Sequence, residues 1–231
     1  MAAPLIAITT DIIDRNGRET AICTTAYADA VWSAGGQPVL LVPGAGRPKD
    51  IAKRFDGFVF TGGDDPRTED FGEPTDPRVT PVDHRRQTFE TALLDMLREK
   101  HPEAPVLGVC LGMQMLALTR GGHLNQYMPD AHEGHAGHWD ADHAIETVDA
   151  ELLKAGVVHS RHKQAIDDPG ELAVLASSAD GVIEAVHDPE VAFCVGVQWH
   201  PERTADAALG EGLFARLVKA AKSDVAKNPG Q

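Results

Sequence analysis

Cys110 stands between a run of apolar residues and a stretch with helical spacing, in the segment PVLGVCLGMQML. Gly108 and Gly112 flank it two residues to either side, which permits a sharp turn like the G-x-S-x-G elbow of serine hydrolases. A helix that begins just after a cysteine stabilises the thiolate and offers backbone N–H groups that can hold an oxyanion. The segment predicts a nucleophilic cysteine, with a buried structural cysteine as the alternative.

A histidine and a glutamate lie two residues apart near the other end of the chain, in GVQWHPE. Residues two apart share a face of an extended segment, so Glu202 can hold one ring nitrogen of His200 while the other faces a thiol. Pro201 favours an extended backbone at His200. A solvated strand end is the alternative for this motif alone. Together with Cys110, it predicts a Cys-His-Glu triad at one edge of an α/β sheet.

The elements that would position these groups alternate between strands and helices. This order is typical of β-α-β units and of a mostly parallel sheet with helices on both faces. In the first half we expect strands at 5–10, 38–42, 57–61 and 105–109, and helices at 20–34, 49–55, 83–100 and 112–119. Asp83 is the expected N-cap of the third helix. The connection 62–81 is long and polar, as functional loops often are.

The second half has closely spaced strand patterns, at 143–148, 157–166, 172–176, 182–186 and 192–198. We therefore expect part of this half to be antiparallel. A final helix over 205–221 precedes a polar tail that ends NPGQ. The even density of these signals predicts one domain over residues 1–231.

Composition excludes several classes of protein. The chain has 231 residues, 42% of them hydrophobic, and 21 basic against 35 acidic residues, so its net charge is 21 − 35 = −14. A surface of that sign repels nucleic acid and anionic lipid, and we expect neither as a partner. Three widely spaced cysteines predict no disulfide framework. The N-terminus has no basic segment of a signal peptide, so we expect a cytoplasmic protein.

The segments GVCLGMQ and GVQWHPE resemble the two signatures of class I glutamine amidotransferases. The likeness covers nearly the whole chain in the right order and includes the glycine pair after the third strand. It implies a three-layer, flavodoxin-like α/β fold, and it calls for no cofactor and no metal. By this resemblance the triad is Cys110, His200 and Glu202, and the oxyanion hole consists of the N–H groups of Leu111 and of Gly63 or Gly62.

Further segments are similar to the peptidase C26 branch of stand-alone γ-glutamyl hydrolases, which includes γ-glutamyl-γ-aminobutyrate hydrolases. They are the Phe71-Gly72-Glu73 segment, the start of the helix after Asp83, and the sequences VVHSRHKQAI and DGVIEAV. This resemblance implies cleavage of a γ-glutamyl amide through a cysteine thioester, with release of glutamate and an amine. The expected partner is a small γ-glutamyl substrate, and a homodimer is compatible with this function.

Four further residues are candidates for contacts with substrate. Gln114 matches the family glutamine that helps to shape the substrate pocket. Ser160, His162 and Gln164 alternate along one expected strand and could face the same pocket. A structural role is the alternative for Gln114 and for His162.

A group of histidines also stands out: His132, His135, His138 and His143. Three of them recur at every third residue, but the segment has no paired cysteine and no H-E-x-x-H motif. We therefore predict no metal site there.

Two other functions fit the same sequence. Leu111 makes the nucleophile turn read C-L-G, as in true glutamine amidotransferases, where the C26 branch usually has Arg. The chain would then be a glutaminase subunit that passes ammonia to a synthase partner. A catalytically inactive binding or regulatory module on the same fold is the third possibility, and it predicts an unreactive thiol at Cys110.

Overall fold

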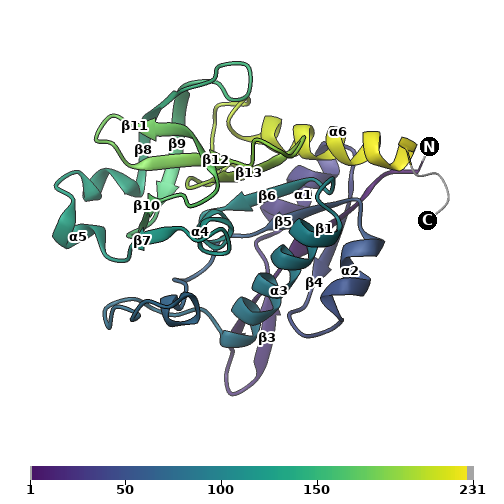
Figure 1. Ribbon diagram of the computed structural model, residues 1–231, viewed down its shortest axis with the longest axis horizontal. Coiled ribbons are helices and arrows are strands. Elements are labelled where there is room, and N and C mark those ends of the chain that lie inside the picture. Colours follow the sequence, from purple (N-terminus) through teal and green to yellow (C-terminus); the bar gives the residue numbers. More distant parts are fainter. Residues whose placement is uncertain (1, 228–231) are drawn as a thin grey trace.

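Within residues 2–227, the part of the chain that the computed structural model describes, eleven strands form one mixed sheet with helices on both faces (Figure 1). The strand order is β4-β1-β5-β6-β13-β12-β11-β8-β9, and β10 joins β12 to β7. From β4 to β13 the strands pair in parallel, and beyond β13 the pairs are antiparallel. The predicted α/β fold with antiparallel strands in its C-terminal half is confirmed.

The parallel half of the sheet is apolar along almost its whole length. Strands that are covered on both faces need such continuous apolar runs, because neither face contacts water. The buried strands of this half are β1 (Leu5–Thr9), β5 (Gly57–Phe60), β6 (Val106–Val109) and β13 (Cys194–Val197), whereas the edge strand β4 (Gln37–Leu41) is partly exposed.

Two hydrophobic cores lie on opposite faces of this half. On one face α1 (Thr25–Ser33) and α6 (Glu211–Lys227) pack against the sheet, and on the other face lie α2 (Pro48–Arg54), α3 (His84–Lys100) and α4 (Leu111–Leu118). The side chain of Asp83 accepts a hydrogen bond from the backbone N–H of Arg85, so it caps α3 as expected. The apolar side chains on one face of this helix are buried: Phe89, Leu93, Leu94 and Leu97.

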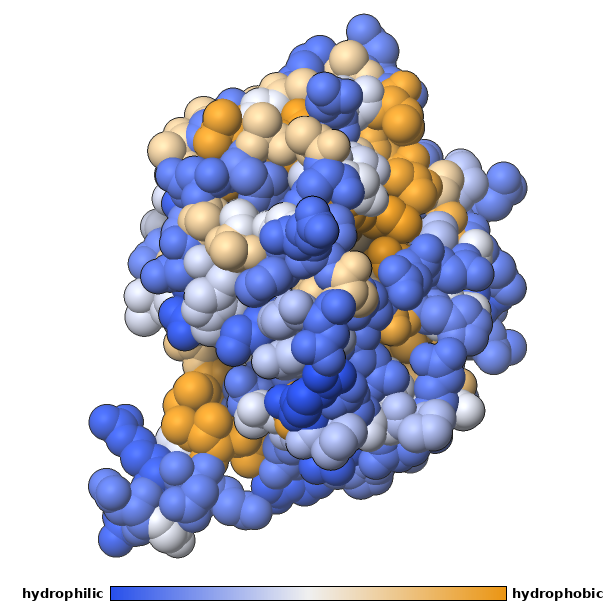
Figure 2. Space-filling view, turned by 90° about the vertical axis from the view of Figure 1, so that its left-hand side faces the viewer, coloured by the Kyte–Doolittle hydropathy of each residue, from blue (hydrophilic) through white to orange (hydrophobic). Residues whose placement is uncertain are grey.

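The antiparallel half forms one end of the molecule together with several short elements. Its strands are β12 (Ile183–His187), β11 (Ala173–Ser178), β8 (Trp139–Thr147), β9 (Gly156–Arg161), β10 (Ala165–Asp168) and β7 (His123–Asn125). The short helices are α5 (Met128–Ala131) and η2 (His135–His138), and η1 (Thr68–Phe71) lies in the long loop after β5. This end is mainly hydrophilic, and apolar residues form separate areas on it (Figure 2).

The helix expected over 20–34 begins only at Thr25. The residues before it form a hairpin of β2 (Asp11–Asp14) and β3 (Glu19–Ile22). Asn16 and Gly17 turn this hairpin with positive φ angles of 57° and 75°. An Asn-Gly pair is a strong hairpin signal, and the sequence analysis missed it.

Two further boundaries differ from the prediction. The strand expected over 157–166 is interrupted between β9 and β10, because residues 162–164 leave the sheet. The last helix begins at Glu211 rather than near residue 205, because a turn closed by the bond from Gly210 N to Asp206 O (2.7 Å) precedes it. The polar tail NPGQ lies outside the described residues. None of the helices in the described chain is both long and apolar enough to span a membrane.

Candidate active site

Cys110 occupies a strained turn between β6 and α4. Its φ of 51° and ψ of −105° lie where residues with a Cβ are rarely found, and such strain is concentrated at functional sites. The flanking residues must be glycines, because the turn leaves no room for a side chain at either position. A Cβ on Gly112 would lie 2.2 Å from the carbonyl oxygen of Phe60, and a Cβ on Gly108 would lie 2.6 Å from that of Gly112. The sharp turn inferred from the G-x-C-x-G spacing is therefore present.

His200 follows β13, which pairs in parallel with β6, so the histidine and Cys110 emerge at the same edge of the sheet. His200 Nδ1 lies 2.8 Å from Oε1 of the fully buried Glu202 side chain. Burial lowers the pKa of His200, but interactions with Cys110 and Glu202 outweigh it and raise that pKa to about 9. The ring is thus held in one orientation by a carboxylate and faces a thiol.

The continuous extended segment predicted to join His200 to Glu202 is wrong. Residues 201–203 form a turn, in which the N–H of Arg203 donates to the carbonyl of His200 over 3.0 Å. The turn still brings the side chains of His200 and Glu202 together, because it folds the chain back on itself within two residues. The two-residue spacing of His200 and Glu202 therefore predicted their contact correctly, although it did not predict the turn that produces it.

Gln198 is a site residue that the sequence analysis missed. Its Nε2 donates to Sγ of Cys110 over 3.5 Å, and its Oε1 accepts a bond of 3.2 Å from Nε2 of Gln114. All three residues are buried. An N–H donor at sulfur stabilises negative charge there. Gln198 lies within the GVQWHPE segment, so its place in that motif was the available signal.

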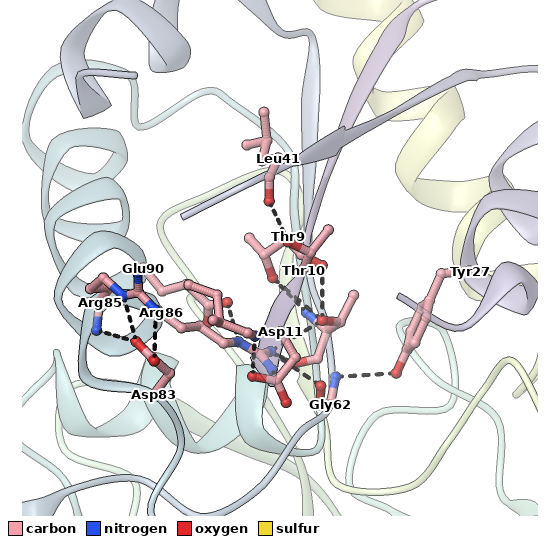
Figure 3. A network of polar contacts seen from close by, with 12 residues as sticks. Thr9, Thr10, Asp11, Tyr27, Leu41, Gly62, Asp83, Arg85, Arg86 and Glu90 are labelled. Carbon is pink, nitrogen blue, oxygen red and sulfur yellow. Dashed lines mark hydrogen bonds and ion pairs between the residues drawn. The ribbon is translucent and has the colours of Figure 1, made fainter. Parts of the chain in front are cut away.

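The turn Thr61-Gly62-Gly63 after β5 is held from two sides (Figure 3). From α3, Arg86 donates to the carbonyls of Thr61 (2.8 Å) and Gly62 (3.1 Å). From α1, Tyr27 accepts the N–H of Gly62 at its hydroxyl oxygen over 3.1 Å. Within the described chain, that bond occupies the Gly62 amide, whereas the amides of Gly63 and Leu111 have no hydrogen-bond acceptor. Gly63 is therefore the glycine whose N–H is available to an oxyanion.

Arg86 is itself completely buried and paired. Its Nε lies 2.8 Å from Oε1 of Glu90, and its Nη1 lies 3.5 Å from Oδ2 of Asp11. Burial lowers the pKa of Arg86, but the two carboxylates outweigh it and raise that pKa above its usual value. Gly63 must lack a side chain next to this guanidinium, because a Cβ there would lie 2.3 Å from Nη1.

A cavity of about 470 Å³ opens at Cys110 and His200. Three of the four residues predicted to contact substrate line it: Gln114, His162 and Gln164. Ser160 does not line it, because Ser160 lies within β9, whereas His162 and Gln164 follow the end of that strand.

The wall of the cavity carries charges of both signs. The acidic residues are Asp11, Asp64 and Asp65, and the basic ones are Arg78, Arg161, Lys163 and Arg203. Lys163 Nζ lies 4.3 Å from the centre of the Trp139 ring, and the Arg161 guanidinium lies 5.0 Å from it. Cations over an aromatic face are attracted by the ring, so Trp139 stabilises two positive groups on this wall.

The model of the Peptidase C26 family matches residues 4–202 of this chain. The chain belongs to the peptidase C26 family. Members of this family are generally cysteine-dependent amide hydrolases, and the chain is also similar to glutamine amidotransferases.

Relatives of this C26 protein include a protein of Mycobacterium tuberculosis named as a candidate glutamine amidotransferase. It is 36% identical over 209 residues, which are 84% of this chain and 66% of the relative, so the chain spans just under two thirds of that protein. The γ-glutamyl-γ-aminobutyrate hydrolase of Escherichia coli is 26% identical, over 91% of each chain.

Solved structures share the fold of this C26 protein. A glutamine amidotransferase of Thermotoga maritima superposes with a TM-score of 0.60 at 18% identity, over 100% of this chain and 87% of its own. The glutaminase domain of Trypanosoma brucei CTPS, solved with bound acivicin, gives 0.64 at 16% identity, over 96% of this chain and 94% of its own. At these identities the likeness establishes the fold alone.

Proposed function

We propose that this protein hydrolyses the γ-glutamyl amide bond of γ-glutamylated amines. Cys110 is the nucleophile, His200 transfers protons, and Glu202 orients His200. The observation that carries the proposal is the imidazole of His200, clamped 2.8 Å from a buried carboxylate and facing a thiol on a strained turn that opens into a cavity. An activated nucleophile needs this arrangement of nucleophile, base and orienting group.

The reaction follows from these groups in two stages. The thiolate of Cys110 attacks the γ-carbonyl, and the N–H groups of Leu111 and Gly63 donate to the oxyanion. Protonated His200 gives its proton to the departing amine, which leaves a γ-glutamyl thioester. His200 then takes a proton from water, which attacks the thioester and releases glutamate, so that the Cys110 thiolate and protonated His200 are restored. With a pKa of about 9, His200 carries the proton that the first stage needs at neutral pH.

The charges on the cavity wall support a γ-glutamyl substrate. A γ-glutamyl group carries both an ammonium and a carboxylate, and the wall offers Asp64 and Asp65 for the first and Arg161 and Lys163 for the second. The remaining cations favour an amine that itself carries a carboxylate. The Escherichia coli relative, by its name, acts on such a compound, γ-glutamyl-γ-aminobutyrate.

A glutaminase that supplies ammonia to a synthase partner is the second candidate function. Leu111 favours it, because the residue after the nucleophile completes the C-L-G turn of glutamine amidotransferases. The two functions differ in the leaving group, which is an amine in one and ammonia in the other. An inactive module on the same fold is disfavoured by the pairing of His200 with Glu202 beside the thiol.

The test is a panel of γ-glutamyl amides, with glutamine included, and mass spectrometry of the products. We expect glutamate and free amine from γ-glutamyl amides of amino acids, no product from Cys110→Ala, and full activity in the control Cys194→Ala, whose sulfur lies outside the cavity. Faster release of glutamate from glutamine than from every amide, enhanced by a copurifying protein, would replace this function with the glutaminase. An unreactive thiol in the wild-type protein would favour the inactive module.

A further inference from the structure

A buried cluster of histidines and carboxylates adjoins the cavity and shares His162 with it. The cluster is centred on Glu184 of β12, whose side chain is fully buried. His138 Nδ1 lies 3.0 Å from Glu184 Oε1, His143 Nε2 lies 3.1 Å from the same oxygen, and His162 Nε2 lies 3.7 Å from it. Rings from three separate segments therefore converge on one carboxylate.

The protons of two of these rings are fixed by bonds at the nitrogen that faces away from Glu184. His162 Nδ1 lies 2.7 Å from the carbonyl oxygen of Gln164, and His143 Nδ1 lies 3.2 Å from that of Gly137. A carbonyl only accepts, so each Nδ1 carries the proton, and in the neutral ring Nε2 presents a lone pair. That lone pair faces a carboxylate oxygen, which also only accepts. Such a pairing is stable only if positive charge lies between the two atoms.

The third ring, His138, is oriented by a second carboxylate. Its Nε2 lies 3.0 Å from Oδ2 of Asp180, to which His132 Nε2 also comes within 2.8 Å. With its proton on Nε2, His138 turns the lone pair of Nδ1 toward Glu184. Histidines that bind metals commonly donate their other ring N–H to a carboxylate or a backbone carbonyl, and all three rings here do so.

The atoms that face the centre of the cluster lack other partners. Within the described chain, five of them are buried and without a hydrogen bond: both carboxylate oxygens of Glu184, Nδ1 of His138, and Nε2 of His143 and His162. Burying so many polar atoms that face only one another is costly unless positive charge lies among them, and a bound cation supplies it. The ligand atoms of His138, His162 and Glu184 lie within 4.8 Å of one another. Ligands around a tetrahedral zinc ion are separated by about 3.3 Å, so small side-chain movements suffice.

We propose that Nδ1 of His138, Nε2 of His162 and the carboxylate of Glu184 bind a divalent transition-metal cation of the zinc type. Two imidazoles and one carboxylate form a ligand set that suits this ion, and the fourth position is left for water or for His143. The ion links η2 and β12 to residues 162–164, all three of which line the cavity. Its role is to hold this wall of the cavity in place.

The spacing of His132, His135, His138 and His143 did not predict such a site. Two of the three ligands, His162 and Glu184, are distant in sequence from that group, and only the fold brings them to His138. His135 is not among the described residues that surround Glu184.

The test uses untagged protein with the Cys110→Ala substitution, so that neither a histidine tag nor the nucleophilic thiol binds metal. After removal of metals with a chelator, Zn²⁺ is titrated by calorimetry and Co²⁺ is added for visible spectroscopy. We expect one ion per chain with a Kd below about 1 µM, a cobalt spectrum of a tetrahedral site without a thiolate band, and a higher melting temperature with zinc. Glu184→Gln and His138→Gln should each weaken binding by roughly a hundredfold or more.

The matched control is His123→Gln, which removes an exposed histidine paired with Glu73 at 2.6 Å and should leave binding unchanged. The parent protein, whose cluster carries no substitution, provides a measurement of its own, because the cobalt spectrum reports ligand type directly. Absence of stoichiometric binding, an octahedral cobalt spectrum, or equal binding in Glu184→Gln and the parent would each overturn the proposal. In that case protons alone supply the positive charge of the cluster.

Discussion

The buried pair of Arg86 and Glu90 offers a way to separate stability from catalysis. Arg86→Met leaves Glu90, whose side chain is 1% exposed, as an unpaired buried charge. Removing one partner of a buried ion pair costs about 3–5 kcal/mol of unfolding free energy. The substitution also removes the donors to the carbonyls of Thr61 and Gly62, so it releases the turn that carries the Gly63 amide. We expect kcat/KM to fall by about a hundredfold or more, as when an oxyanion donor is lost.

The double variant Arg86→Met/Glu90→Met removes both charges at similar volume. Replacement of a buried ion pair by apolar residues is often neutral or stabilising, so the double variant should recover about 3 kcal/mol relative to the single one. It cannot restore the donors to the Gly62 turn, and activity should stay low. Urea unfolding measures the first effect, and hydrolysis of a chromogenic γ-glutamyl anilide measures the second.

Arg85→Met is the matched control on the same helix. Arg85 pairs with Asp83 (Figure 3) and with Glu19, and its side chain is half exposed. Ion pairs in contact with solvent contribute little, so both stability and activity should stay close to wild type. If the double variant recovered activity together with stability, Arg86 would serve only to neutralise Glu90. The inference that it positions the Gly62–Gly63 turn would then be refuted.

Three further predictions concern the same site. Glu202→Gln should lower kcat/KM by roughly 10²–10⁴-fold, and it should lower the pKa of His200 in an NMR titration, because the carboxylate contributes to raising it. Protonated His200 should stabilise the fold fully below pH 6.5, the ordinary pKa of histidine, and this stabilisation should be lost as the pH rises through about 9. Urea unfolding should therefore show the difference in unfolding free energy between wild type and His200→Gln decreasing from pH 6.5 to about 9. Gly63→Ala should lower kcat about a hundredfold, because the added Cβ would lie 2.3 Å from Arg86 Nη1 and displace the turn. The control Gly137→Ala should have no effect, because no atom lies within 4 Å of the added Cβ. Equal rates in the two variants would contradict the role of Gly63.

Local features of the sequence predicted the scaffold of the site well. The glycines around Cys110 and the apolar runs on either side of it identified the turn, because backbone strain and strand or helix periodicity depend on residues close in the chain. The parallel order of the strands then placed His200 beside Cys110, since the ends of adjacent parallel strands share one edge of the sheet. The Asn16-Gly17 hairpin also depends only on neighbouring residues, but the helix expected from residue 20 overlapped its second strand.

Contacts between distant segments decided the rest, and only the tertiary structure contains them. The amide of Gly62 is occupied because Tyr27 reaches it from α1, and Gln198 reaches the thiol from the strand beside it. Glu184 and His162 join His138 because antiparallel strands bring them together. The sequence by itself indicated the family, the alternation of strands and helices, and Cys110, His200 and Glu202 as the candidate triad. Side-chain packing across the sheet decides which backbone amide is free and which histidines contact a carboxylate. The spacing of residues along the chain does not predict these contacts.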